Sequence, residues 1–272
     1  MLRVVLLTMY DVNYRVASNW AARNGHEIVL VGTLPRSASA LAAALPPTAH
    51  LLSTSQLTTV APPIIAATAP DLLISMGYSR LLPAEILNLP KYGAVNVHPS
   101  ALPAGRGPNP TRLLYDGATE LGATLHRTDA QFDTGAILSQ RTRPLPLDLT
   151  GEAVFYAWLE MFDEILEEGV PRAVDGSPGL PQDNTLSSYA APFADEERTL
   201  DLSEPLAVIR RKTVALNVLG ATARVNLPEP TVISRVDVVP TTALDAAPGT
   251  ILLTHHDGWT VRAGEGALRL TR

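Results

Sequence analysis

The first 33 residues alternate between apolar runs of strand length and a segment with helical periodicity. The runs "RVVLLTMY" (residues 3–10) and "EIVLVGT" (residues 27–33) are rich in Val, Ile and Leu, as buried strands are. Between them Val12, Val16 and Trp20 recur every four residues, and Gly25 follows where a helix commonly ends. A strand, a helix and a strand in this order predict a parallel sheet.

The rest of the first 170 residues continues this pattern. The turn after the first strand contains no glycine, which excludes a dinucleotide-binding fingerprint and a P-loop. We therefore expect an α/β fold with a Rossmann-like, mostly parallel sheet flanked by helices. Further strands are predicted at 71–77, 94–98, 123–129 and 136–145, and helices at 81–90, 109–117 and 150–169, with two short ones within 35–70.

Composition divides the chain further. Residues 170 to 195 are rich in Pro, Gly, Ser and Asp, which is typical of a linker. A helix at 204–218 and short strands at 231–239, 249–254 and 259–272 follow. We predict a catalytic domain at 1–170, a linker at 171–197 and a smaller β-rich C-terminal domain at 198–272.

Charge and residue content exclude several classes of function. The chain has no cysteine, which rules out disulfides and thiolate metal sites. Its net charge of −6 does not favour binding to DNA. No apolar run reaches the ~18 residues of a membrane span, and no signal peptide is evident, so we expect a cytoplasmic protein without membrane contact. His255 and His256 are adjacent on a predicted strand and point to opposite faces, so we expect no metal.

The segment "GAVNVHPSALPAGRGPNP", residues 93–110, places two polar side chains at the end of an apolar strand. Asn96 and His98 are two residues apart and share a face. In open α/β sheets, ligands bind at the carboxyl ends of the strands. A capping Asn and an exposed His at a strand terminus would explain the same spacing.

The segment "TDAQFDTGAIL" adds a carboxylate, Asp133, in a loop between two predicted strands. An Asx-turn would explain this residue by itself. Together with Asn96 and His98, it forms a set that suits acyl transfer to an amine, in which an oxyanion develops and the attacking nitrogen loses a proton.

These two segments resemble the 10-formyltetrahydrofolate-dependent formyltransferases, whose catalytic pattern is Asn-x-His at a strand end and an Asp in a downstream loop. Asn96, His98 and Asp133 match that pattern. The resemblance implies 10-formyltetrahydrofolate as co-substrate. It also implies that Asn96 donates to the formyl oxygen, that a charged His98 stabilises the oxyanion, and that Asp133 raises the pKa of His98. The last 24 residues resemble the OB-like C-terminal domain of the tRNA-directed members.

The resemblance also implies where the folate binds. Two loops are expected to hold the pterin, and they supply Met76, Gly77, Tyr78, Leu81, Leu82 and Pro83, with Gln131 and Phe132. Candidate contacts to the acceptor substrate are Ser100, Arg106, Pro108 and Asn109. Arg106 could equally order its own loop. For His126 we expect a structural role, with support of a catalytic residue as the alternative.

The acceptor is not readable from a motif. The acidic catalytic domain and a loop after the second strand with one arginine favour a small amine, either a hydroxyornithine-like precursor or a nucleotide-linked amino sugar. Methionyl-tRNA is the alternative, and Arg210, Arg211 and Lys212 could then contact phosphate. A formyltetrahydrofolate hydrolase would use the same three residues on water, although such relatives usually carry an extra N-terminal domain. A non-catalytic folate-binding module would be expected to lack one of the three. No pattern predicts an oligomeric state.

Overall fold

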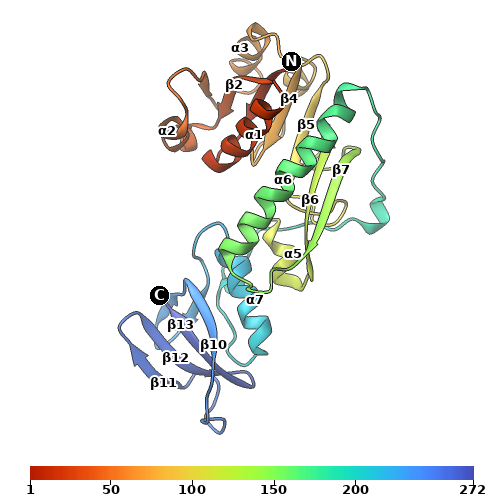
Figure 1. Ribbon diagram of the computed structural model, residues 1–272. Helices are drawn as coiled ribbons and strands as arrows, with labels where there is room; N and C mark the ends of the chain where they lie inside the picture. Colours follow the sequence, from red (N-terminus) through yellow and green to blue (C-terminus); the bar gives the residue numbers. More distant parts are fainter. The chain divides into compact units, whose positions relative to one another are not determined.

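The computed structural model describes all 272 residues, and contacts between them define two units (Figure 1). Unit 1 comprises residues 1–108, 122–143 and 158–189. Unit 2 comprises residues 109–121, 144–157 and 190–272. Neither unit is a continuous stretch of sequence, because the chain enters and leaves unit 2 more than once.

Unit 1 is built on a seven-stranded sheet with the strand order β3-β2-β1-β4-β5-β6-β7. The pairs β1–β2, β1–β4, β2–β3 and β4–β5 are parallel, whereas β5 and β6 are antiparallel. This confirms the expected mostly parallel, Rossmann-like sheet. The strands are β1 (Arg3–Leu7), β2 (Glu27–Thr33), β3 (Leu51–Ser53), β4 (Leu72–Met76), β5 (Ala94–His98), β6 (Glu120–Arg127) and β7 (Ile137–Pro144).

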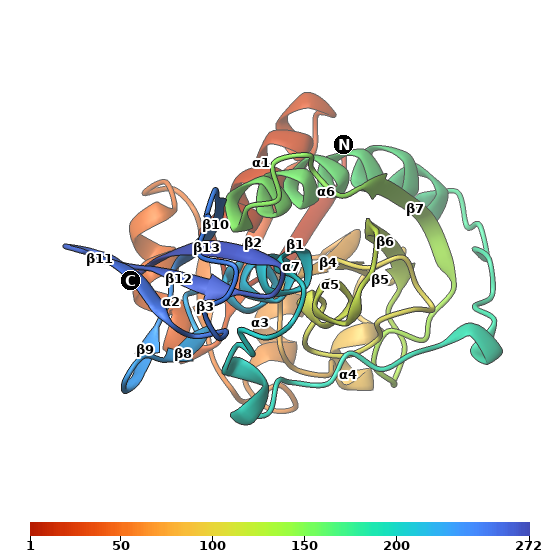
Figure 2. The ribbon, with the colours of Figure 1, turned by 90° about the horizontal axis from the view of Figure 1, so that it is seen from below.

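Helices cover both faces of this sheet, as Figure 2 shows. On one face lie α1 (Asp11–Arg23) and the second half of α6 (Gly151–Val174), and on the other lie α3 (Ala61–Ala67) and α4 (Ala84–Leu87). The core against α3 and α4 includes Val5, Leu7, Ile65, Leu73 and Ile86. Each such side chain contributes about 1.5–3 kcal/mol of hydrophobic free energy, so the sheet is a rigid base for the polar groups on it.

The strand order changes direction at β1. From there the chain proceeds to β2 and β3 on one side and to β4 and β5 on the other, which makes the gap between β1 and β4 a topological switch point. Asn13, in the first turn of α1, donates from Nδ2 to the Met76 carbonyl at the end of β4 at 2.9 Å. Gly77 follows with φ of +68°, and a Cβ there would lie 2.5 Å from that Asn13 nitrogen. The loop after β4 is therefore held in place from α1.

Unit 2 contains α5 (Thr111–Asp116), α7 (Leu206–Asn217) and antiparallel strands. Its main sheet has the order β10-β13-β12-β11, and β8 and β9 form a separate pair. Its core includes Ile209, Leu216, Ile233, Val261 and Leu268. The predicted smaller β-rich part is therefore present. The strands are β8 (Arg224–Asn226), β9 (Pro230–Val232), β10 (Arg235–Val239), β11 (Ile251–His255), β12 (Gly258–Ala263) and β13 (Gly266–Thr271).

Some boundaries differ from the sequence-based expectations. The segment predicted as one strand at 231–239 forms two strands, β9 and β10. Between them the Ile233 N–H donates to the Ala223 carbonyl, and the Ser234 N–H donates to the Thr271 carbonyl. Contacts also group α5 and the start of α6 with α7, whereas the sequence placed residues 1–170 in one domain. That 1–170 and 198–272 are separate domains stays a prediction. No helix combines the length and apolar character that crossing a bilayer requires.

Candidate active site

β5 presents Asn96 and His98 on the same face of the sheet. Its antiparallel neighbour β6 places His126 opposite Asn96 and Thr124 opposite His98. The Asn96 Nδ2 group donates to His126 Nε2 at 3.1 Å. A second imidazole therefore stands beside Asn96, in the position of a supporting residue, which was the alternative to a purely structural role for His126.

Asp133 reaches the same face from the loop between β6 and β7. This loop leaves β6 beside the amino end of β5, because the two strands are antiparallel, and then folds over the sheet. Asp133 Oδ1 lies 3.3 Å from Asn96 Nδ2, 3.5 Å from His98 Nδ1 and 3.5 Å from His126 Nε2. Asp133 therefore lies close to both other residues predicted from sequence, near the carboxyl end of β5, whose last residue is His98.

The loop after β5 supplies backbone groups to two of these side chains. The Gly107 N–H donates to Asp133 Oδ2 at 2.9 Å, and the Gly105 carbonyl lies 2.8 Å from His98 Nε2. Asp133 itself has φ of 55°, in the left-handed region, which costs a non-glycine residue about 1–2 kcal/mol. Surrounding contacts must therefore hold this residue in its conformation.

The hydrogen-bond partners fix the protons on both imidazoles. A carbonyl oxygen can only accept, so His98 Nε2 must carry a proton toward Gly105. In the neutral ring the unprotonated nitrogen is Nδ1, which faces Asp133. His126 Nδ1 donates to the Arg127 carbonyl at 2.8 Å, so its Nε2 is free to accept from Asn96.

Burial and neighbouring charges act in opposite directions on these groups. Burial lowers the pKa of His98, and the Asp133 carboxylate and the Gly105 carbonyl raise it only in part. The Asp133 carboxylate thus raises the pKa of His98, as the resemblance implied, but the imidazole is 5% exposed and desolvation prevails. Burial also raises the pKa of Asp133, but His126, His98 and the Gly107 N–H outweigh it and the net pKa lies below the usual value. Near neutral pH the pair is a neutral imidazole beside a carboxylate.

The loops expected to hold the pterin expose some of their predicted side chains and bury others. Leu81 is 42% exposed and Phe132 is 52% exposed, which leaves apolar surface open on both loops. Met76 and Leu82 are buried in the core, so their side chains cannot contact a ligand in this conformation. Tyr78 is half-buried against the core of unit 1, whereas Gln131 is exposed. Gly77 and Pro83 can offer a ligand only backbone or ring atoms.

Most residues expected to contact the acceptor are engaged within the protein. Ser100 is 1% exposed and its hydroxyl donates to the Ala104 carbonyl at 2.7 Å, so it holds the loop and is closed to a substrate. Asn109 donates to the Ala191 carbonyl at 2.9 Å within unit 2. Pro108 is exposed. Arg106 is bound to amide oxygens of a segment that the sequence suggested was only a linker.

That segment is the largest omission of the sequence analysis. Gln182 donates from Nε2 to the Asp133 carbonyl at 2.9 Å and to the Gly135 carbonyl at 2.7 Å. Its position in a stretch rich in Pro, Gly and Asp gives no signal of a contact with the site. The spacing of His126 and Thr124 on one strand predicts that they share a face of the sheet. The sequence does not predict the antiparallel register of β5 and β6, which places His126 opposite Asn96.

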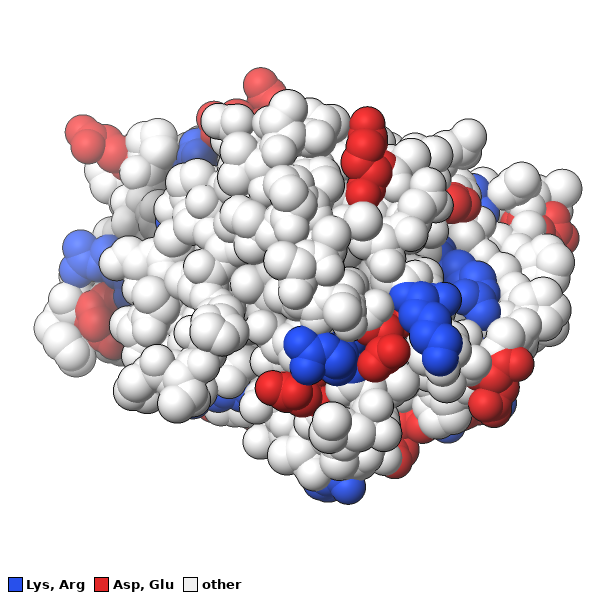
Figure 3. Space-filling view, turned by 90° about the horizontal axis from the view of Figure 1, so that it is seen from above, with Lys and Arg blue, Asp and Glu red and all other residues white.

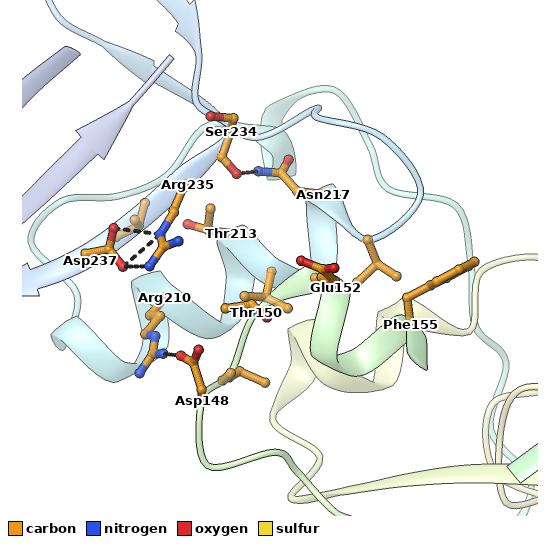
Figure 4. A pocket seen from close by; sticks show the side chains of 15 residues that line it. Asp148, Thr150, Glu152, Phe155, Arg210, Thr213, Asn217, Ser234, Arg235 and Asp237 are labelled. Atoms are coloured by element: carbon orange, nitrogen blue, oxygen red, sulfur yellow. Dashed lines mark hydrogen bonds and ion pairs between the residues drawn. The ribbon is translucent and has the colours of Figure 1, made fainter. Parts of the chain in front are cut away.

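Unit 2 contains a separate pocket of about 520 Å³ between the start of α6, α7 and β10 (Figure 4). Its two arginines are turned to acidic neighbours: Arg210 bonds Asp148 at 3.0 Å and Arg235 bonds Asp237 at 2.8 Å. Lining cations that are already paired leave little free positive charge for an anionic ligand. None of the residues expected to act in catalysis lines this pocket.

Comparison with known proteins shows which family the chain belongs to. Residues 37–167 match the model of a family described as formyl transferase. Over 269 residues the chain is 32% identical to a methionyl-tRNA formyltransferase of Thiobacillus denitrificans, covering 90% of this chain and 83% of that enzyme. The chain belongs to the formyl transferase family. A methionyl-tRNA formyltransferase of Ralstonia nicotianae is 34% identical over 212 residues, and the matched region spans 64% of its length.

Solved structures share the fold of this formyl transferase family member. HypX from Aquifex aeolicus, in complex with tetrahydrofolic acid, superposes with a TM-score of 0.73 at 19% identity, covering 99% of this chain and 43% of HypX. The sugar 3N-formyl transferase WlaRD, crystallised with dTDP and 5-N-formyl-THF, gives a TM-score of 0.68 at 15% identity, covering 100% and 97%. At these identities the likeness concerns the fold.

Proposed function

We propose that this chain transfers a formyl group from 10-formyltetrahydrofolate to an amine or hydroxylamine nitrogen of a small molecule. The observation that carries the proposal is the convergence of Asn96, His98 and Asp133 within hydrogen-bonding or ion-pair distance on one sheet face. The donor would supply an electrophilic formyl carbon whose oxygen gains negative charge as the nitrogen attacks. Collapse of this adduct breaks the bond from the formyl carbon to N10 of the donor, which leaves as tetrahydrofolate with the proton that the attacking nitrogen loses.

His98 and Asp133 act together on the proton of the attacking nitrogen. His98 Nδ1 carries the free lone pair and lies 3.5 Å from Asp133 Oδ1, so it can take up that proton while the carboxylate stabilises the resulting imidazolium. This differs from the charged His98 that the family resemblance implied. The lowered pKa of His98, caused mainly by burial, favours the neutral base at rest.

Asn96 polarises the formyl oxygen. Its Nδ2 group faces both His126 and Asp133, so donation to a substrate oxygen requires one of these hydrogen bonds to be exchanged. The bond to Asp133 is the longer, at 3.3 Å, and it involves an oxygen that His98 also approaches. We therefore assign the N–H directed at Asp133 to the substrate, while the bond to His126 keeps the amide oriented.

The exposed surface beside these groups fits a flat, partly apolar donor. Leu81 and Phe132 leave apolar side-chain surface in water, on loops that also offer backbone hydrogen-bonding groups. We assign the contacts with the pterin to these two side chains and to the backbone from Gly77 to Pro83. The buried side chains of Met76 and Leu82 would only shape the wall behind them.

Two observations favour a small acceptor over tRNA. Arg210 is paired with Asp148 and Lys212 with Glu204, so two of the three cations in the basic run are neutralised by neighbours. On the face drawn in Figure 3, most Lys and Arg side chains stand beside Asp or Glu, and no basic patch extends across that face. Nonspecific binding to nucleic acid needs such a patch. A cytoplasmic location remains a prediction from the sequence.

A donor assay with defined acceptors tests the proposal. The protein is incubated with 10-formyltetrahydrofolate and either N5-hydroxyornithine, a dTDP-linked amino sugar, methionyl initiator tRNA or no acceptor. Release of tetrahydrofolate and the mass of the acceptor are followed together. We expect turnover that requires one of the two small acceptors and yields its formylated form.

The other outcomes each identify an alternative. Turnover that requires methionyl-tRNA would assign the chain to the activity of its curated relatives. Turnover of equal rate without any acceptor would make it a hydrolase, and donor binding without any turnover would make it a folate-binding module. Each of these results would overturn the proposed reaction or its acceptor class.

A further inference from the structure

Residues 180–189 form a strap across the two loops of unit 1 that hold the candidate catalytic groups. Leu180 exchanges two backbone hydrogen bonds with Ile137, each 2.8 Å long. Farther along, the Ser188 hydroxyl accepts from the Gly105 N–H at 2.9 Å, and the Ser188 carbonyl accepts from the Arg106 N–H at 3.0 Å. The strap is therefore fixed at one end to β7 and at the other to the loop after β5.

The side chain of Gln182 joins the two loops between these ends. Its Oε1 accepts from Arg106 Nε at 3.0 Å and from Arg106 Nη2 at 2.8 Å. Its Nε2 donates to the Asp133 and Gly135 carbonyls at 2.9 and 2.7 Å. Both lone pairs of the oxygen and both protons of the nitrogen are thus used, which defines the orientation of the amide.

Each loop that Gln182 contacts also orients a group of the candidate site. The loop around Arg106 provides the Gly105 carbonyl to His98 and the Gly107 N–H to Asp133. The second loop contains Asp133 itself, in a left-handed conformation that is unfavourable without support. Gln182 bonds the carbonyl of this strained residue directly.

We propose that Gln182 is a positioning residue for the reaction, which holds Asp133 and the backbone partners of His98 in one arrangement. The inference rests on the proposed function of that site. The hydrogen bonds of the Gln182 side chain go to Arg106 and to the Asp133 and Gly135 carbonyls, and none goes to a side chain of the three candidate catalytic residues. Gln182 therefore acts through the two loops. A displacement of about 1 Å at a reacting group can lower a rate about 100-fold, so such a contact can control kcat.

Two substitutions separate this role from simple anchoring of the strap. Gln182→Glu keeps an acceptor for Arg106 but places an oxygen against the two carbonyls, whereas Gln182→Met removes both interactions. Asn184→Ala is the matched control, because the Asn184 side chain accepts from Arg106 Nη2 at 2.9 Å but makes no hydrogen bond to the Asp133 loop. All variants are assayed with 10-formyltetrahydrofolate and the acceptor among the two small probes that supports turnover.

We expect kcat to fall about 10- to 100-fold in both Gln182 variants, with KM for the donor and the melting temperature close to wild type. The acid limb of the kcat profile should move to lower pH, since a displaced Asp133 carboxylate and a displaced Gly105 carbonyl no longer raise the pKa of His98, the proposed base. Asn184→Ala should keep both the wild-type kcat and the wild-type profile. Affinity for 5-formyltetrahydrofolate, a stable analogue, should be unchanged throughout.

The contrary results are distinct. A Gln182→Glu enzyme with wild-type kcat and an unmoved acid limb would show that the contact with Arg106 is sufficient, and the inference would be wrong. An equal loss of melting temperature and donor affinity in both Gln182 variants would make the residue structural only. Asp133→Asn is measured in parallel: if it retains full turnover, the proposed function fails, independently of Gln182.

Discussion

Gly135 offers the sharpest structural test of how the Asp133 loop is positioned. This residue lies two positions after Asp133, and a Cβ added to it would stand 1.8 Å from the Arg127 carbonyl oxygen at the end of β6. Real Cβ atoms essentially never approach such an atom closer than 3.0 Å, so in Gly135→Ala the loop must move away from the strand by about 1.2 Å. The obstacle is backbone, which cannot rotate aside.

The displacement gives the expected magnitude. A shift of about 1 Å in a catalytic group lowers a rate about 100-fold, equivalent to about 2.7 kcal/mol in the activation free energy. We therefore expect kcat of Gly135→Ala, measured as formylated product in the acceptor assay, to fall by that factor. KM for the donor should rise no more than about fivefold, the loss expected for the Phe132 contact, because the apolar contacts at Leu81 remain.

A second glycine supplies the control. Gly176 has φ of +77° and no atom within 4 Å of an added Cβ. Gly176→Ala therefore adds about 1 kcal/mol of backbone strain in unit 1 without displacing Asp133, and should lower the melting temperature by about 3 °C with kcat intact. Wild-type kcat in Gly135→Ala, or an equal loss in Gly176→Ala, would refute this account of the loop.

Three further predictions concern neighbouring residues. Burial holds the folded pKa of His98 below its unfolded value of about 6.5, so the unfolded chain binds the extra proton first and stability falls as pH drops below that value. His98→Gln should therefore reduce the loss of melting temperature between pH 7 and pH 5. An undiminished loss would contradict this. His126→Phe removes the acceptor that orients Asn96 and should lower kcat about 10-fold with donor affinity kept; unaltered kcat would show that Asn96 needs no such partner. Phe132→Ala should weaken binding of 5-formyltetrahydrofolate about fivefold by calorimetry, whereas equal affinity would place the pterin elsewhere.

The sequence predicted the parallel part of the sheet because its strands and helices carry strong local patterns. β1, β2, β4 and β5 are apolar runs, and the spacing of Asn96 and His98 gives their common face directly. The convergence of both with Asp133 could be inferred from the resemblance to a known family. Each of these features follows either from a local sequence pattern or from a family motif.

What the sequence did not predict depends on long-range contacts. The antiparallel register of β5 and β6, which places His126 beside Asn96, is a property of the folded sheet. The strap has the composition of a linker, yet the side chain of Gln182 within it is hydrogen-bonded to both the Arg106 loop and the Asp133 loop. The lowered pKa of His98 likewise follows from burial, which the exposed-looking end of a strand did not suggest.

The most direct test of the central claim compares formyl transfer by the wild type with that by His98→Ala and Asp133→Asn. Enzyme in excess over 10-formyltetrahydrofolate is mixed with the small acceptor, and the formylated acceptor is quantified by mass spectrometry in a single turnover. We predict product from the wild type and a rate lower by at least about 1000-fold in both variants, with 5-formyltetrahydrofolate still bound. Product formation at the wild-type rate by either variant would contradict the assignment of this site.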